Sequence, residues 1–218
     1  MAEPLYTQRP TLHPRGFASG IVLPYGLRSA EVKAALDDLY DFLHNVNTFL
    51  ISRGWDRLEE TLSPATFSGL ISEMVVSGVA KRSATLTVNQ FHNGRPDLVP
   101  TGVYPNEAVQ RGDEGIEVKA SRNDGSWQGH NAENGWIMVF QYSVDTKTQP
   151  VAARPPTKFQ RVLIAQLEAG DWSFSGRGEG SRRTPTASIL RSGVSKLAAN
   201  PVYLDPDYRA PGTANKGA

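Results

Sequence analysis

The chain has 218 residues, of which 39% are hydrophobic and 21% charged, a composition typical of a soluble globular protein with one sizeable core. It contains no cysteine, which excludes disulfides, cysteine-ligated zinc and thiol catalysis. The sequence shows neither a secretory signal nor an apolar run long enough to span a membrane, so it predicts a cytoplasmic protein without membrane contact.

The net charge of +1 conceals an uneven distribution. Residues 146–218 hold 11 Lys and Arg against 5 Asp and Glu, whereas residues 1–145 hold 12 against 17. A basic segment suits phosphate groups, so the asymmetry favours a polyanion as partner. A merely well-solvated surface would show the same excess, and that alternative stays open.

The first part of the chain predicts an arm followed by two helices. Residues 1–28 are rich in proline and glycine and predict an irregular arm. Apolar residues at helical spacing predict a helix over about 29–53, with Ser29 as N-cap. A second helix begins after Ser63, with Pro64 at its first position, and is expected to end at Gly78.

Strands dominate the middle of the chain, and a helix is expected near its end. Apolar and β-branched runs predict strands over 84–91, 97–104, 115–121 and 136–144. Two further runs, 160–167 and 172–175, are expected to form a hairpin, and a last helix is predicted over about 185–199.

This order of elements predicts one α/β (α+β) domain with a mixed central sheet flanked by helices, over residues 29–200. Residues 201–218 are expected to form an extended or flexible tail.

One pair of short motifs carries chemistry. Pro96-Asp97 precedes a predicted strand, and Glu117-Val118-Lys119 lies inside another. Alternate side chains of a strand share a face, so Glu117 and Lys119 point the same way while Val118 points into a core. Two carboxylates suit a hard divalent cation, and an ammonium can steady an attacking water. Glu-x-Lys is also common on solvated strands, so a plain surface pair with Asp97 in a turn stays open.

The pattern resembles the PD-(D/E)xK nuclease superfamily, which includes many type II restriction endonucleases, over about residues 73–142. The resemblance implies a restriction-endonuclease-like domain in which Asp97, Glu117 and the carbonyl of Val118 bind Mg²⁺, with Mn²⁺ as a substitute. It gives Lys119 the role of orienting or activating the attacking water. Glu73, near the end of the second predicted helix, stands where many of these nucleases carry another acidic ligand, and is otherwise a surface residue.

Two segments are candidates for contact with double-stranded DNA. The polar loop after the Glu-x-Lys strand carries side chains suited to base edges. A glycine- and arginine-rich segment before the last predicted helix suits phosphates. For both segments the alternative of an ordinary solvated loop stays open. The candidate residues are Ser121, Arg122, Asn123, Gln128, His130 and Asn131 in the loop, and Arg177, Arg182 and Arg183 in the basic segment.

These features together predict a Mg²⁺-dependent endonuclease that hydrolyses DNA phosphodiester bonds, with sequence-specific restriction as its most specific form. Cutting both strands of a duplex needs two sites, so a twofold-symmetric homodimer is expected. Two alternatives stay open: a nonspecific repair or phage-defence nuclease, and a DNA-binding protein of the same fold that does not cut.

Overall fold

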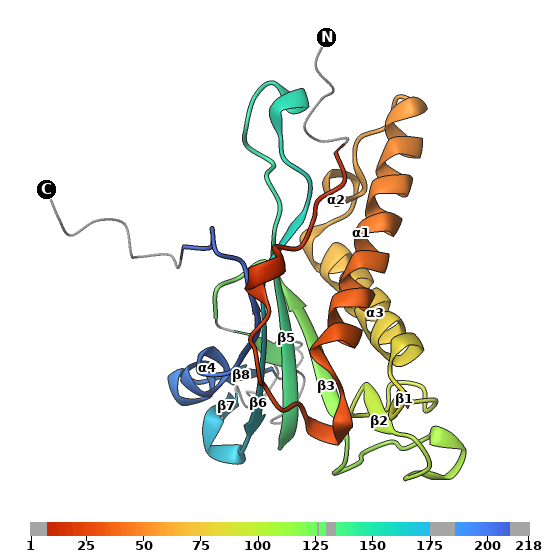
Figure 1. Cartoon of the computed structure of the whole chain (residues 1–218), viewed down its shortest axis with the longest axis vertical. Coiled ribbons are helices and arrows are strands. Elements are labelled where there is room, and N and C mark those ends of the chain that lie inside the picture. The colour runs from red at the N-terminus through yellow and green to blue at the C-terminus, as the bar shows by residue number, and fades with distance from the viewer. Residues whose placement is uncertain (1–7, 126, 130–133, 175–185, 210–218) are drawn as a thin grey trace, which may run out of the picture.

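A six-stranded sheet forms the centre of the computed structural model, which describes residues 8–125, 127–129, 134–174 and 186–209 (Figure 1). Strands β3 and β5 run parallel, and every other neighbouring pair is antiparallel, so the sheet is mixed, as the sequence predicts. In spatial order the strands are β1 (Leu86–Val88), β2 (Leu98–Pro100), β3 (Ile116–Ser121), β5 (Gly135–Ser143), β6 (Lys158–Leu167) and β9 (Pro201–Leu204).

Helices cover one face of this sheet (Figure 1). They are α1 (Ser29–Ser52), the short α2 (Leu58–Thr61) and α3 (Pro64–Arg82). Their apolar sides, including Leu36, Phe67 and Ile71, share one buried cluster with Val118 and Phe140 of the sheet. None of the described helices combines the length and the apolar character that crossing a membrane requires.

The second predicted helix does not end at Gly78, because α3 continues to Arg82. Gly78 instead lies where α3 crosses α1. A Cβ at this position would be 3.1 Å from the Cβ of Ala35, so the glycine allows the two helices to approach closely.

The other face of the sheet is covered by a three-stranded sheet and a helix. Strands β4 (Gln128–Gly129), β8 (Ala187–Ile189) and β7 (Trp172–Phe174) form this small sheet, and α4 (Arg191–Ala198) packs beside it. Their buried side chains form a second apolar cluster with alternate residues of β5 and β6. The molecule is therefore an α+β fold in which helices and a small sheet enclose a mixed sheet.

Two predictions for the C-terminal third are wrong. Strands β6 and β7 do not form a hairpin, because β6 belongs to the central sheet while β7 pairs with β8. The predicted helix over 185–199 is split, since residues 187–189 form β8 and only residues 191–198 are helical. Trp172 pairs with Ile189, and both are buried in the second cluster, which favours a strand over another helical turn.

Residues 201–204, expected in the tail, form strand β9 of the central sheet beside β6. The N-terminal arm reaches the same strand: Phe17 forms a β-bridge with Tyr203, and Ala18 N–H donates to the carbonyl of Val202 at 3.1 Å. Within the described part of the arm, regular structure is limited to two short 3₁₀ turns. Leu12, Leu23 and Leu27 of the arm join the main core.

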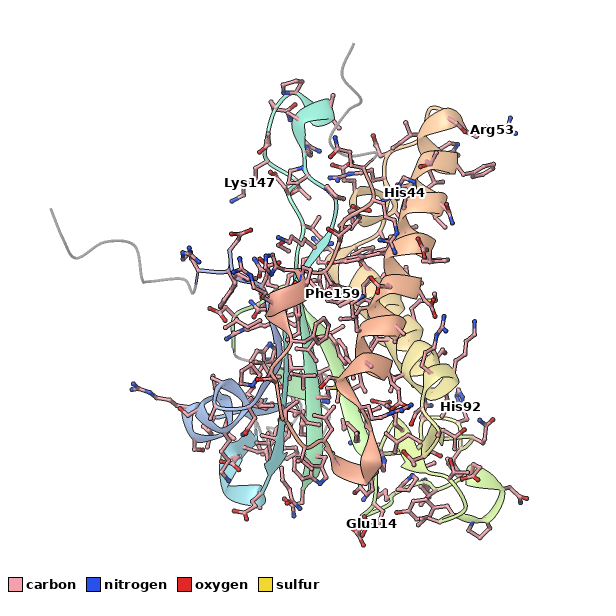
Figure 2. All side chains as sticks on the ribbon, viewed as in Figure 1. His44, Arg53, His92, Glu114, Lys147 and Phe159 are labelled. Carbon is pink, nitrogen blue, oxygen red and sulfur yellow. The ribbon has the colours of Figure 1, made fainter. Side chains whose placement is uncertain are left out.

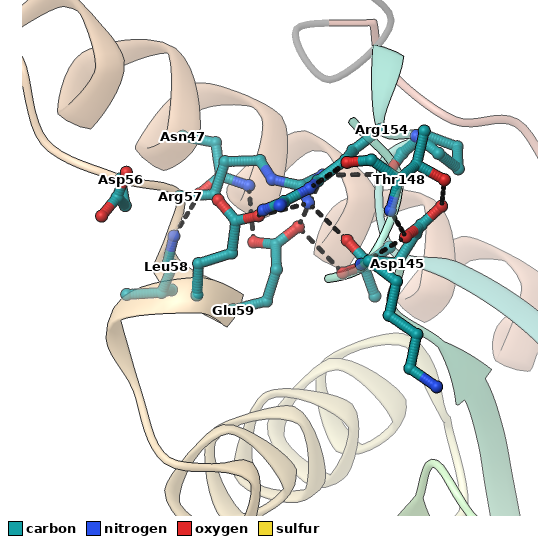
Figure 3. Close-up of polar contacts among 12 residues, drawn as sticks. Asn47, Asp56, Arg57, Leu58, Glu59, Asp145, Thr148 and Arg154 are labelled. Carbon is teal, nitrogen blue, oxygen red and sulfur yellow. Dashed lines mark hydrogen bonds and ion pairs between the residues drawn. The ribbon is translucent and has the colours of Figure 1, made fainter. Parts of the chain in front are cut away.

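A buried polar cluster ties the helices to the long connection between β5 and β6 (Figure 3). The Arg57 side chain is only 1% exposed and donates to the carbonyls of Pro155 (2.8 Å) and Asp145 (3.0 Å) and to Glu60 (3.1 Å). Buried Glu59 accepts from Asn47 at 2.9 Å. Buried charges are costly unless paired and hydrogen-bonded, so this cluster makes the docking of the connection specific.

Candidate active site

Glu117 and Lys119 lie side by side on one face of β3, as the alternation of the strand predicts. In the parallel pairing with β5, Glu117 stands opposite Ile137 and Lys119 opposite Val139. Both of these partners belong to the cluster under the small sheet. The Glu117 and Lys119 side chains are 14% and 12% exposed, and Lys119 Nζ lies 3.1 Å from Glu117 Oε1. The pair is thus a partly shielded ion pair and not a solvated surface pair.

Asp97 joins this pair through the main chain of β3. The β1–β2 hairpin holds Asp97, whose carbonyl accepts from Asn89 N–H at 2.9 Å. The antiparallel pairing of β2 with β3 places Leu98 opposite Ile116. Beyond it, the Asp97 carboxylate acts as acceptor, and Val118 N–H donates to its Oδ2 at 2.8 Å. The Asp97 carboxylate therefore lies at Val118, the residue between Glu117 and Lys119.

Asn89 organises the turn that carries Asp97. Its Nδ2 donates to the carbonyls of Pro96 (2.9 Å) and Val109 (2.8 Å), and its Oδ1 accepts from the N–H groups of Phe91 and Val109. One side chain thus joins the turn to the loop before β3. The sequence reasoning missed Asn89, because its role depends on a loop twenty residues away.

The same loop brings two arginines together. Arg95 N–H donates to the carbonyl of Gln110 at 3.1 Å, and Gly112 N–H donates to the carbonyl of Arg95 at 2.8 Å. These bonds form a parallel bridge between Arg95 and Arg111. Arg95 directly precedes the Pro-Asp motif, which is the signal that could have marked it as a site residue.

Gly115 allows the start of β3 to approach β2. Its φ is +138°, and a Cβ there would lie 2.2 Å from the carbonyl oxygen of Leu98. Its N–H donates to the Tyr25 hydroxyl at 2.8 Å, and that hydroxyl donates to Glu114 at 2.9 Å. Burial raises the pKa of Tyr25 above its usual value, so the hydroxyl stays protonated at neutral pH.

A cavity of about 490 Å³ opens beside Glu117, at the end of the sheet where β3 and β5 begin. Figure 2 marks this end by Glu114, at the opposite end of the molecule from Arg53 on α1. Phe174, at the end of β7, contributes a ring to the wall, although no sequence motif marks this residue. The described residues that line the cavity include Arg95, Pro96, Arg111, Asp113, Glu117, Asn134, Trp136, Ile137 and Phe174.

Two carboxylates, Asp97 and Glu117, and the main-chain carbonyl of Val118 are oxygen donors of the kind that Mg²⁺ takes. Within the part of the chain that the structure describes, no three His, Cys, Asp or Glu side chains come together as a metal-binding group. Magnesium keeps several waters and is usually held by one or two carboxylates together with substrate phosphates. In a strand, N–H and C=O of one residue point to the same side. The carbonyl of Val118 therefore faces the edge where Asp97 lies and suits a third ligand.

Glu73 is not brought to this site. It is exposed on α3, and α3 packs on the face of the sheet that includes Val118. Glu117 and Lys119 occupy the opposite face, so the sheet separates Glu73 from them. The arrangement gives no support to Glu73 as a further metal ligand, and that role stays a prediction.

The loop after β3 starts at the end of the strand opposite the cavity. Arg122, expected to contact bases, turns inward: its guanidinium lies 5.4 Å from the ring centre of Phe67 and 5.9 Å from that of Tyr142. It also donates to the carbonyl of Glu59 at 3.4 Å. Stacking on two rings makes Arg122 part of the packing between sheet and helices, and its predicted role in base recognition is not supported.

Two of the other loop candidates face solvent. Asn123 and Gln128 are exposed, whereas the Ser121 hydroxyl accepts from Asn123 N–H at 3.0 Å and fixes the turn. The remaining candidates, His130, Asn131, Arg177, Arg182 and Arg183, lie outside the described residues.

Comparison of the chain with protein-family models, with curated proteins and with solved structures gives no match. The geometry of Asp97, Glu117 and Lys119 and the cavity beside them are therefore the features that bear on function.

Proposed function

We propose that this protein is a Mg²⁺-dependent endonuclease that hydrolyses DNA phosphodiester bonds with Asp97, Glu117 and Lys119. The observation that carries the proposal is the hydrogen bond from Val118 N–H to Asp97 Oδ2, at 2.8 Å. It brings the carboxylate of the Pro-Asp motif to the strand whose Glu117 and Lys119 pair at 3.1 Å. Glu117 also lines an open cavity, which gives a substrate access to the site.

Each residue of the site has a distinct part in the proposed reaction. When bound, Mg²⁺ would polarise the scissile phosphate and increase the acidity of a bound water. Asp97 and Glu117 would hold the ion, and the bond from Val118 keeps Asp97 in place before substrate arrives. Lys119 donates hydrogen bonds to the attacking water or to the phosphate oxygen that gains charge. The water oxygen bonds to phosphorus as one ester oxygen leaves with a proton.

Type II restriction is the specific form of this proposal, with a domain of the restriction-endonuclease kind. The mixed sheet flanked by helices, with the Glu-x-Lys strand inside it, supports that form. Cleavage of both strands of a duplex would involve two copies of the site, and hence a homodimer. Arg95 and Arg111 on the cavity wall add positive charge where a phosphate would enter.

The deciding experiment is a cleavage assay on long mixed-sequence DNA with and without Mg²⁺. Discrete fragments indicate restriction, a continuous smear indicates a nonspecific nuclease, and a mobility shift without cutting indicates a DNA-binding protein. The variants Asp97→Asn, Glu117→Gln and Lys119→Ala should each lose cutting. Asp56→Asn and Lys147→Ala are matched controls, because both side chains are exposed and away from the site. Cleavage that persists in all three site variants would overturn the proposal.

A further inference from the structure

The cavity beside Glu117 has room for more than a phosphate group. Its volume of about 490 Å³ falls within the range of pockets that enclose whole small molecules. Its wall is divided by chemistry. The charged side chains of Arg95, Arg111 and Asp113 come from the turns before β2 and β3, and that of Glu117 comes from β3 itself. The apolar side chains of Trp136, Ile137 and Phe174 come from the start of β5 and the end of β7.

Phe174 is the unusual member of this wall. The residue is 56% exposed, although Trp172 in the same short strand is buried. A phenyl ring at the mouth of a cavity offers a π-face, and base stacking on aromatic rings tolerates any sequence. The ring is therefore suited to hold a nucleobase that is not stacked within a duplex.

The charged side of the wall complements the phosphate of such a nucleotide. The main-chain bonds between Arg95 and residues 110–112 hold Arg95 and Arg111 next to each other. Asp113 also lines the cavity and would repel a phosphate on its own side. A nucleotide with its phosphate toward the two arginines and its base toward Phe174 satisfies both halves of the wall.

We propose that this cavity receives one unpaired nucleotide of the substrate DNA, with its base stacked on Phe174. The inference rests on the proposed function, because the occupant belongs to the strand that Asp97, Glu117 and Lys119 would cut. In an intact duplex a base cannot reach the ring without leaving its stack, which costs free energy. A perfect duplex would bind and be cut with the cavity empty, so DNA that is already unpaired at the site should bind more tightly and be cut faster than the duplex.

The test compares two labelled DNAs of one sequence, a duplex and the same duplex with a short central bubble. Dissociation constants are measured by fluorescence anisotropy with Ca²⁺ in place of Mg²⁺. The wild type should bind the bubble more tightly, and Phe174→Ala should weaken bubble binding by about 5-fold to 150-fold with little effect on the duplex. Phe174→Tyr keeps the ring and should retain the preference. Phe49→Ala is the matched control, because Phe49 is 59% exposed on α1.

A second readout detects stacking directly. With 2-aminopurine in the bubble, stacking on Phe174 should quench fluorescence in the wild type and in Phe174→Tyr, and Phe174→Ala should abolish the quenching. Equal affinity of the wild type for both DNAs, or an equal loss on both in Phe174→Ala, overturns the inference.

Cleavage of the same DNAs in Mg²⁺ separates this inference from the proposed function. Cutting without any preference for the bubble overturns the nucleotide site alone. Phe174-dependent binding without cutting overturns the nuclease and supports the site.

Discussion

The carboxylate of Asp97 accepts a hydrogen bond from the main-chain N–H of Val118, at 2.8 Å. Removal of this acceptor should destabilise the fold as well as the site. Asp97→Ala should lower the free energy of unfolding by about 1–3 kcal/mol, because it leaves the Val118 donor without its present acceptor. Asp97→Asn keeps a side-chain oxygen and should lose less stability. Urea unfolding at constant m-value measures both variants. Equal stability of the two would show that the bond contributes nothing to the fold.

Replacing Glu117 with Gln should remove Mg²⁺-dependent cutting without unfolding the protein. A neutral amide is a far weaker ligand for a hard divalent cation than a carboxylate. Titration of cleavage against Mg²⁺ concentration measures the effect, and Asp56→Asn should behave as the wild type. On the resemblance to PD-(D/E)xK nucleases, Ca²⁺ should support DNA binding without cleavage. Cutting in Ca²⁺ at the Mg²⁺ rate would contradict this.

Lys119→Ala should abolish cleavage while DNA affinity changes little. The ammonium is held against Glu117 in a partly shielded position, where it can act on the attacking water and not on the duplex as a whole. Single-turnover cleavage and a binding titration on the same DNA separate the two effects. Lys147→Ala, on an exposed loop, should change neither. Wild-type turnover in Lys119→Ala would remove this residue from the mechanism.

Arg57→Ala should be strongly destabilising. The guanidinium is buried beside Glu59 and Glu60, and its loss removes a cationic partner from both carboxylates, so that Glu60 keeps Arg154. Breaking one side of a buried ion pair typically costs about 3–5 kcal/mol. Arg53→Ala removes an exposed arginine that stacks on Phe49, and should cost about 1 kcal/mol or less. Denaturant unfolding compares the two, and similar losses would contradict the role given to Arg57.

The same cluster should make stability depend on acid pH. Burial alone would raise the pKa of Glu60, but hydrogen bonds from Arg57 and Arg154 outweigh it and hold the pKa below its usual 4.5. A lowered folded pKa means that the contribution of Glu60 is complete above pH 4.5 and is lost as the pH falls through the folded pKa.

The free energy of unfolding should therefore decline below that pH, and Glu60→Gln should make the decline shallower. Urea titrations from neutral pH down to about pH 3 measure this slope. An unchanged slope in Glu60→Gln would assign the decline to other carboxyl groups.

The sequence predicts those elements whose apolar residues form a regular or a continuous pattern. Helix α1 and strand β3 follow from periodicity, and β5 follows from its continuous apolar run, because it is buried on both faces. Strands β8 and β9 follow from neither pattern. Each is only three or four residues long, and its strand conformation depends on pairing with β7 or β6. Local propensity carries little information about such pairing.

The residues of the candidate site also differ in whether the local sequence or contact with distant segments reveals them. The motif can be recognised in the sequence because its three residues, Asp97, Glu117 and Lys119, lie in or next to predicted strands. Arg95 and Arg111 come together only through main-chain bonds between two loops, and Phe174 approaches from another sheet. Arg122 looked like a base-reading residue, but the rings of Phe67 and Tyr142 that receive it lie far from it in sequence.

The contact between the arm and β9 limits how copies of this chain can associate. Strand β9 is the outer strand on its side of the central sheet, and exposed outer strands readily add a strand from another molecule. Here Ala18 already donates to Val202, and Phe17 bridges Tyr203. The arm therefore covers this border at Val202 and Tyr203, and a second copy of the chain could continue the central sheet there only by displacing the arm.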